Sequence, residues 1–168
     1  FPSFKIFLTP KALILLGFTF LSFDLLKMLI IILYLNKKDM KNQKTSMAFV
    51  AASWIALLAG VVGFIVGLVR AEMLLNEKGY YFTILLYGLF AVISLQKAVR
   101  DRLENIPVTD IYYGICWFGT LSSITLLIIG LVNADILPSE KGFYAFAFLL
   151  ALFGAISVQK NTRDNLSS

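Results

Sequence analysis

The sequence predicts an all-α, polytopic membrane protein in which one helical hairpin occurs twice. Three observations predict this fold class. Of the 168 residues, 59% are hydrophobic, and the mean hydropathy is +0.83. Four long segments carry no charge, and such segments are typical of transmembrane helices. The second half of the chain also repeats polar residues of the first half at a constant offset.

Four uncharged segments define the expected spans. They cover Ala48–Val69, Gly79–Gln96, Ile111–Val132 and Gly142–Gln159. At about 1.5 Å per residue, their lengths are roughly 33, 27, 33 and 27 Å. The hydrocarbon core of a bilayer is about 30 Å thick. We therefore expect four core transmembrane helices, long and short in alternation.

An internal repeat relates the first two spans to the last two. When residues 54–101 are aligned with 117–164, 21 of 48 positions are identical. The matches include Glu77-Lys78-Gly79 with Glu140-Lys141-Gly142, which a shared apolar composition does not explain. We expect a first two-helix repeat at 46–103 and a second at 109–165. Because each repeat holds two spans, both enter the membrane from the same side, as parallel repeats.

The distribution of Lys and Arg predicts the orientation. Three of them lie at the end with the Glu-Lys-Gly loops, namely Arg70, Lys78 and Lys141. Seven lie at the other end: Lys41, Lys44, Lys97, Arg100, Arg102, Lys160 and Arg163. Because basic residues concentrate on the cytoplasmic side, we expect the core termini in the cytoplasm and the Glu-Lys-Gly loops outside. Tyr80, Tyr81, Phe143 and Tyr144 would then form the outer aromatic belt.

Residues 1–39 form an extra N-terminal apolar segment outside the repeat. Its stretch 12–35 is long enough for a fifth transmembrane helix, but it carries Asp24 and Lys27 near its centre. The two charges lie three residues apart on one helix face and could pair within the membrane. The pair could mark a functional site, or it could be tolerated in an additional span or in an extension that is not used in the cell.

The Glu-Lys-Gly loops have a structural and a functional interpretation. Asn76 and Ser139 are suitable N-cap residues, and a carboxylate in the first turn is favoured by the helix dipole. The glycines would allow another backbone to approach closely. In the functional interpretation, a polar cluster binds a cation or a partner protein. Its members are Glu72, Glu77, Lys78, Gly79, Asp135, Glu140, Lys141 and Gly142.

A second polar motif, Gln-Lys-x-x-Arg-Asp, ends each repeat. Basic residues at this position anchor a helix end and attract anionic head groups. The alternative is a specific contact with a lipid or a partner. The candidate residues are Gln96, Lys97, Arg100, Asp101, Gln159, Lys160, Arg163 and Asp164.

Rows of small residues mark expected helix contacts. Ala52, Ala56 and Gly60 are four apart, Gly63 and Gly67 follow, and Ala147, Ala151 and Ala155 form a similar row in the last span. Such faces allow close helix packing in lipid. They can serve the internal bundle, a homo-oligomer or both.

The composition argues against most catalytic chemistry. The chain has no His and a single cysteine, Cys116. Nucleophilic triads and His- or Cys-rich metal sites therefore cannot form, and we predict no enzyme, no cofactor and no metal site. The net charge of +5 lies at the ends of apolar segments, so we expect a lipid bilayer as partner and no nucleic acid.

Several stretches together resemble the YiaA/YiaB family of bacterial inner membrane proteins. They are "SWIALLAG" (53–60), "LNEKGYYF" (75–82), "QKAVRD" (96–101), "SEKGFYAFAF" (139–148) and "LFGAISVQKNTRD" (152–164). The resemblance covers roughly residues 46–165 and is closer to the YiaA branch, which has two copies of the two-helix domain. It implies a multi-pass protein of the bacterial inner membrane and no particular activity.

Two functions fit these patterns. The first is a structural or interaction protein that forms a homo-oligomer or binds another membrane protein, supported by the small-residue faces and by an expected lack of buried polar groups in the core. The second is a transporter or channel for an ion or small solute, in which Asp24 and Lys27 would be the ionisable groups inside the membrane.

Overall fold

The computed structural model describes Lys27 and residues 46–166, with the side chains resolved from 46 to 163. In this range the chain forms four α-helices and no strand: α2 (Met47–Arg70), α3 (Leu75–Leu103), α4 (Asp110–Asn133) and α5 (Pro138–Leu166). All four are long and apolar enough to cross a membrane, which confirms the predicted fold class. Asp24 and most of the expected fifth span lie outside the described residues.

The first helix of each repeat begins with a side-chain cap at the same repeat position. Ser46 Oγ accepts a hydrogen bond from Phe49 N (3.3 Å), and Thr109 Oγ1 accepts one from Tyr112 N (3.4 Å). Caps of this kind satisfy one of the backbone N–H groups that a helix start leaves without a partner.

The second helix of each repeat is the longer one, in contrast to the expected order. α3 and α5 contain 29 residues each, and α2 and α4 contain 24. The uncharged segments underestimate α3 and α5 because the Gln-Lys-x-x-Arg-Asp motif continues the helix beyond the apolar part. α3 ends at Leu103, and Asn105, two residues later, has φ 59° and lies in the left-handed region. Ile106 N donates to Asp101 O (2.8 Å), as in a Schellman motif.

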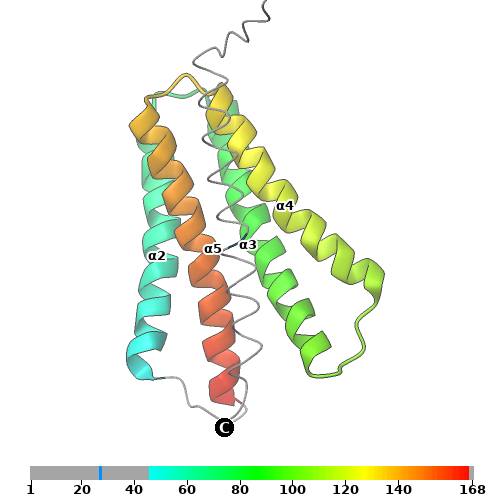
Figure 1. The fold of residues 1–168 in the computed structure, drawn as a ribbon. Helices are drawn as coiled ribbons and strands as arrows, with labels where there is room; N and C mark the ends of the chain where they lie inside the picture. Colours follow the sequence, from blue (N-terminus) through cyan, green and yellow to red (C-terminus); the bar gives the residue numbers. More distant parts are fainter. Residues whose placement is uncertain (1–26, 28–45, 167–168) are drawn as a thin grey trace, which may run out of the picture.

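The main helix contacts connect the two repeats. α2 packs chiefly along α5, and α3 packs along α4, whereas the two helices of each hairpin make few contacts with each other. Figure 1 shows α2 beside α5 and α3 beside α4, with the two pairs closest at the end that holds the connections 71–74 and 134–137. We call this end the EKG end and the opposite one the Gln-Lys end.

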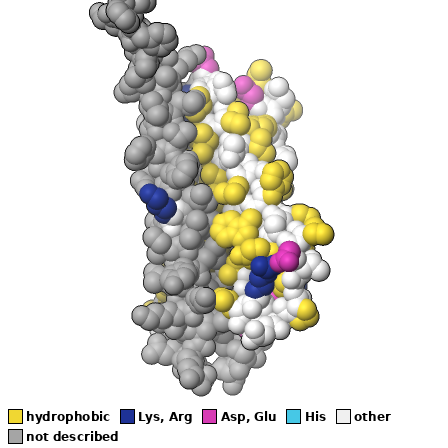
Figure 2. All heavy atoms as spheres, turned by 45° about the vertical axis from the view of Figure 1, so that its right-hand side comes forward, with side chains coloured by type: hydrophobic (Ala, Val, Ile, Leu, Met, Phe, Trp, Pro, Cys, Tyr) yellow, Lys and Arg dark blue, Asp and Glu magenta, His cyan; other side chains and the backbone are white. Residues whose placement is uncertain are grey.

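The two pairs meet through α3 and α5, so the helices follow the spatial order α2, α5, α3, α4. The main core lies between these helices and includes Phe64, Leu85, Leu131 and Phe148, all almost fully buried. A smaller cluster around Leu95 and Cys116 joins α3 to α4 near the Gln-Lys end. The exposed middle of α3 and α4 is largely hydrophobic, and the charged side chains of these helices lie near their ends (Figure 2).

Equivalent residues of the two repeats make equivalent contacts. A Cβ added to Gly67 would lie 3.3 Å from the Tyr144 ring, and one added to Gly130 would lie 3.1 Å from the Tyr81 ring. Gly67 and Gly130 occupy the same repeat position, as do Tyr81 and Tyr144. The pairs α2·α5 and α4·α3 are therefore related by an approximate two-fold axis that passes between α3 and α5.

The contact α2·α5 is closer than its counterpart α4·α3. A Cβ added to Gly60 would lie 2.8 Å from Ala147 O, and one added to Gly154 would lie 2.8 Å from Leu57 Cβ. In the other pair, a Cβ added to Gly119 would lie 3.4 Å from Ala91 Cβ, an ordinary contact distance. Part of the predicted small-residue rows therefore serves the packing of α2 against α5.

Candidate functional site

At the EKG end, the two glutamates of the repeated motif cap their own helices. Glu77 Oε2 accepts a hydrogen bond from Leu74 N (2.9 Å), and Glu140 Oε2 accepts one from Leu137 N (2.9 Å). Glu77 lies in the first turn of α3, where a carboxylate also interacts favourably with the helix dipole. The N-cap of α3 is Leu74, one position before Leu75, so the expected capping role of Asn76 is wrong.

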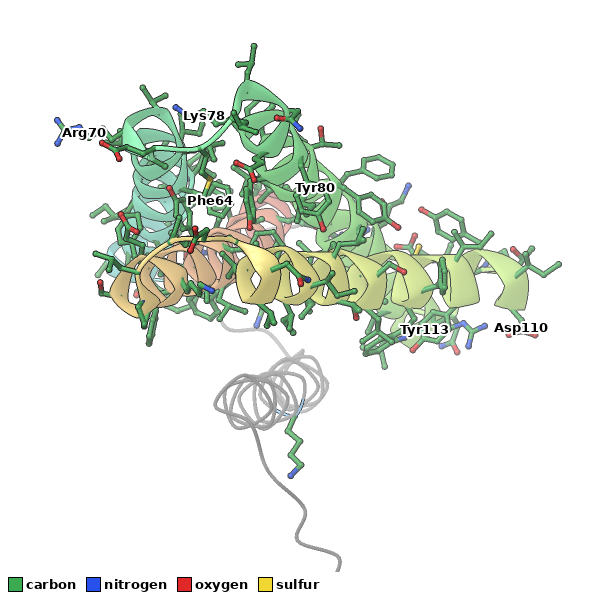
Figure 3. The ribbon with its side chains drawn as sticks, turned by 90° about the horizontal axis from the view of Figure 1, so that it is seen from above. Phe64, Arg70, Lys78, Tyr80, Asp110 and Tyr113 are labelled. Carbon is green, nitrogen blue, oxygen red and sulfur yellow. The ribbon has the colours of Figure 1, made fainter. Side chains whose placement is uncertain are left out.

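The two lysines of the motif cap the preceding helix. Lys78 Nζ donates to Val69 O (3.0 Å) near the end of α2, and Lys141 Nζ donates to Val132 O (3.3 Å) near the end of α4. Figure 3 shows Lys78 beside the connection from α2 to α3. The motif therefore stabilises each short connection, because its glutamate accepts from a backbone N–H at the start of the second helix and its lysine donates to a carbonyl near the end of the first.

The other members of the predicted outer cluster do not form the expected contacts. Glu72 and Asp135 are exposed. No described heavy atom lies within 4 Å of a Cβ added to Gly79 or Gly142, so the expected close backbone approach is not found there. Among the described residues, no three acidic or Cys side chains are placed to hold a metal ion. An open pocket of about 280 Å³ lies nearby, lined in part by Arg70, Glu140 and Phe143.

The aromatic residues at this end are divided between core and surface. Tyr81 and Tyr144 are only 3% exposed, so they belong to the core and are not part of an outer belt. Tyr80 donates its hydroxyl hydrogen to Leu126 O on α4 (2.8 Å; Figure 3), and Phe143 is half exposed.

The Gln-Lys end contains buried polar side chains, which contradicts the expectation that the core lacks them. Gln96 is 2% exposed and Asn161 is 1% exposed. Asn161 Nδ2 on α5 donates to Ser53 Oγ on α2 (2.9 Å), and Ser53 Oγ donates to Phe49 O (2.8 Å). This chain of hydrogen bonds connects residues of the two repeats inside the protein.

A charged network lies next to these amides. Arg100 Nη2 donates to Asp101 Oδ1 (2.9 Å) on the same helix. Arg163 on α5 pairs with Glu104 at the end of α3, and its Nη1 lies 3.9 Å from Asp101 Oδ1. Two guanidinium groups and two carboxylates thus meet where the two repeats adjoin. The Asp164 side chain, the last member of the predicted inner set, lies outside the described residues.

The loop from α3 to α4 is held separately. Arg102 pairs with Asp110, and its guanidinium carbon lies 4.0 Å from the centre of the Tyr113 ring, in cation–π geometry (Figure 3). Lys97 is exposed and Lys160 is half-buried, and their role as a surface anchor stays a prediction.

Five buried side-chain atoms in the described residues have no hydrogen-bond partner, and all five lie at the Gln-Lys end: Gln96 Oε1, Arg100 Nε, Gln159 Oε1, Asn161 Oδ1 and Arg163 Nη1. Gln96 and Gln159 are equivalent by the repeat, as are Arg100 and Arg163. Buried polar atoms without a partner are rare in folded proteins, and a water molecule, an ion or a ligand can satisfy them.

Sequence reasoning missed Ser53 and Asn161, although the repeat contains a signal for them. Their repeat partners are Cys116 and Ala98, two small and less polar residues in the equivalent helix pair α4·α3. The two repeats thus differ in residue type at two positions whose side chains contact each other in the α2·α5 pair. This signal can be read only when α2 is known to pack on α5.

Comparison with known proteins identifies a two-helix domain family and related membrane proteins. The family model described as "yiaA/B two helix domain" matches twice, over residues 49–101 and 112–164. The chain is 56% identical over 126 residues to the inner membrane protein YiaA of Escherichia coli (strain K12), which covers 75% of this chain and 87% of that protein. It is 31% identical over 115 residues to YiaB of the same organism, covering 68% of this chain and 93% of YiaB.

Over a shorter region, the chain is also similar to the uncharacterised membrane protein YubF of Bacillus subtilis (strain 168). It has 36% identity over 65 residues, which is 38% of this chain and 75% of YubF. No solved structure matches the chain significantly. The two matches of the family model coincide with the helix pairs α2–α3 and α4–α5.

Proposed function

The chain belongs to the yiaA/B two-helix domain family, and from this premise we propose that it is a non-catalytic interaction protein of the inner membrane that self-associates through α2. Its relatives are named only as membrane proteins, and its four helices are of membrane-spanning length. In the proposed orientation the Gln-Lys end faces the cytoplasm and the EKG end faces outward.

The exposed face of α2 carries this proposal. α2 is the least buried of the four helices, because it packs chiefly against α5. Ala48, Ala52, Ile55 and Ala59 are all exposed and recur at intervals of four, three and four residues. This spacing places them on one helix face, and the three alanines allow a second helix to approach closely in lipid.

The equivalent face of α4 provides a contrast within the same molecule. Its residues at the same repeat positions include Ile111, Ile115 and Phe118, which are 77%, 61% and 71% exposed. Bulky apolar side chains suit contact with lipid tails, whereas small ones suit contact with another helix. The two repeats thus present different surfaces, and the one on α2 favours a second copy of this chain.

Disulfide trapping tests the proposal. In a Cys116→Ala background, Ala52→Cys should form a disulfide-linked dimer on mild oxidation of native membranes. Ile115→Cys, at the equivalent position of α4, is the matched control and should stay mostly monomeric. Equal cross-linking of the two variants would indicate random collision and would contradict the proposal. Native mass spectrometry of the gently extracted protein should then give a defined homo-oligomer. A monomer, or a complex with a different subunit, would also contradict it.

Transport is supported less well by the described residues. Between residues 46 and 163, the buried amides and the ion pairs lie at one end of the helices and do not form a polar path across the membrane. In the middle of α4, Thr120 and Ser123 are buried, but their hydroxyls donate to the carbonyls of Cys116 and Thr120 on their own helix. Proton-coupled flux that is lost in Asp24→Asn would favour transport instead.

A further inference from the structure

The Gln-Lys end contains a set of polar atoms that the fold does not satisfy and self-association through α2 does not use. We propose that Gln96, Arg100, Gln159 and Arg163 form a binding site for a phosphodiester that also carries hydrogen-bond donors, as in the phosphoethanolamine or phosphoglycerol head group of a membrane phospholipid.

The position of the four residues supports one shared site. Gln96 and Arg100 are four apart on α3, and Gln159 and Arg163 are four apart on α5, so each pair lies on one helix face. α3 and α5 pack against each other, and Arg163 reaches across to Asp101 and Glu104. The two pairs are equivalent by the repeat, and they therefore approach the approximate two-fold axis from opposite sides.

The unpaired atoms indicate the chemistry of the ligand. Arg100 Nε and Arg163 Nη1 are donors, and the Oε1 atoms of Gln96 and Gln159 are acceptors. A bare metal ion would satisfy only the acceptors, and a simple anion would satisfy only the donors. A ligand that satisfies both must accept hydrogen bonds at one part and donate them at another.

The charges around the site restrict the class of ligand further. The charges of Arg100 and Arg163 are offset by those of Asp101 and Glu104 in the same network. A phosphodiester accepts strong, charge-assisted bonds from guanidinium groups. An ammonium or hydroxyl group on the same molecule can donate to the glutamine oxygens. Phospholipid head groups combine both parts, and basic sites between transmembrane helices on the cytoplasmic side commonly bind lipid head groups.

The exposure of the side chains gives the site an accessible and a deeper part. The Arg100 and Arg163 side chains are 20% and 32% exposed, whereas Gln96 is almost completely buried. The phosphate would thus meet the guanidinium groups first, and the donor group would extend inward to the amides. The ligand would hold α3 and α5 together at the end where few apolar contacts join them.

Lipid titration of the purified full-length chain tests this site. The delipidated protein in detergent is mixed with phosphatidylethanolamine, phosphatidylglycerol or a diacylglycerol with the same acyl chains. Bound lipid is counted by native mass spectrometry, and the melting temperature is recorded. We expect the two phospholipids to bind and to raise the melting temperature, and the diacylglycerol to do neither. Equal binding of the diacylglycerol would overturn the proposal.

Variants separate this site from general attraction to the surface. Arg163→Gln should weaken phospholipid binding about tenfold, and the double variant Gln96→Leu/Gln159→Leu about fivefold, as expected for a charged and a neutral hydrogen bond. The Leu variant should also melt at a higher temperature than the wild type without lipid, because it removes unpaired buried oxygens. The matched control, Lys97→Gln/Lys160→Gln, should keep the affinity. Loss of binding in this control alone would overturn the proposal.

A measurement with a water-soluble head-group analogue identifies the source of the phosphodiester. Glycerophosphoethanolamine has the same head group without acyl chains. If it stabilises the wild type but not Arg163→Gln at a concentration similar to that of the lipid, the site recognises the head group and takes it from solution. If it is far weaker than the lipid, the ligand comes from the bilayer. Stabilisation of the wild type and Arg163→Gln to the same extent by both probes would contradict the site.

Discussion

Tyr81 and Tyr144 occupy the same position in the two repeats, and their rings stack on each other with centroids 6.1 Å apart and planes 15° apart. Each ring also packs over a glycine of the other repeat, at Gly130 and Gly67. A residue that meets its own repeat partner must lie close to the axis that relates the two. The tyrosine pair therefore lies close to this axis, where α3 meets α5.

Loss of the tyrosine ring should destabilise the protein strongly. Tyr81→Ala is expected to cost about 3–5 kcal/mol, the range for truncating a buried aromatic side chain. Phe146→Ala removes an aromatic side chain of similar size that is 75% exposed, and it should change the stability by less than about 0.5 kcal/mol. The melting temperature in a mild detergent measures both. Similar losses in the two variants would contradict the central position of Tyr81.

The two repeats should associate as separate polypeptides. If the chain is divided in the α3–α4 loop, fragments 1–106 and 107–168 each lack the main packing partners of their own helices. Co-expressed with a tag on one fragment, most of the untagged fragment should co-purify. Tyr81→Ala in the first fragment should reduce the recovery. Failure of the wild-type fragments to co-purify would contradict packing between the repeats.

Glycine at position 60 should be necessary, whereas glycine at 119 should be replaceable. A methyl group at Gly60 would meet the backbone of Ala147 and Ala151, which cannot move without separating α2 from α5. Gly60→Ala is therefore expected to cost about 1–3 kcal/mol. Gly119→Ala has room for the methyl group and should be neutral or slightly stabilising. Thermal unfolding in detergent compares them, and the reverse order would show that α2 packs differently.

The buried pair Ser53–Asn161 should behave as a coupled unit. Ser53→Cys removes the acceptor of the Asn161 amide and should cost about 1–3 kcal/mol, because a buried donor loses its partner. The double variant Ser53→Cys/Asn161→Ala introduces the residues found at the equivalent positions, Cys116 and Ala98. It should recover at least half of this loss. A double-mutant cycle measures the coupling, and purely additive effects would show that the hydrogen bond contributes nothing.

Membrane orientation can be measured with exposed positions at both ends. In a Cys116→Ala background, Ser139→Cys at the EKG end should react with an impermeant thiol reagent added to intact cells. Thr162→Cys at the Gln-Lys end should react only after the cells are opened. Both native side chains are exposed, so burial does not limit the reaction. The opposite pattern would invert the predicted topology.

The sequence predicts the helices and the repeat well, because charge and apolar length report directly on membrane insertion. It does not predict which helix packs on which. Every apolar face is compatible with lipid tails, so the contact of α2 with α5 depends on close packing at Gly60 and Gly154. Two tandem hairpins are compatible with packing within each hairpin or between them, and in the structure the main contacts are between them.

For the candidate sites too, local contacts follow from the sequence and long-range contacts do not. Glu77 lies in the first turn of α3 as its sequence position suggests, whereas the bond from Lys78 to Val69 O is not predicted. Gln96 resembles a surface anchor in sequence, since it adjoins Lys97 and Arg100. In the structure it is almost fully buried, and α5, whose Arg163 contacts Asp101 and Glu104, begins more than 40 residues later. Long-range contacts of this kind leave no periodic signal in a single sequence.

The pairing of α2 with α5 also imposes an order on biosynthesis. α2 ends at residue 70 and α5 begins at residue 138, so the 67 residues between them must be translated before the partner of α2 starts to emerge. At about 5–20 residues per second, α2 spends roughly 3 to 14 seconds in the membrane without it. During this interval Ser53, Gly60 and the alanine face of α2 are all exposed to lipid or to the insertion machinery. The first hairpin therefore exists for these seconds without the main packing partner of α2.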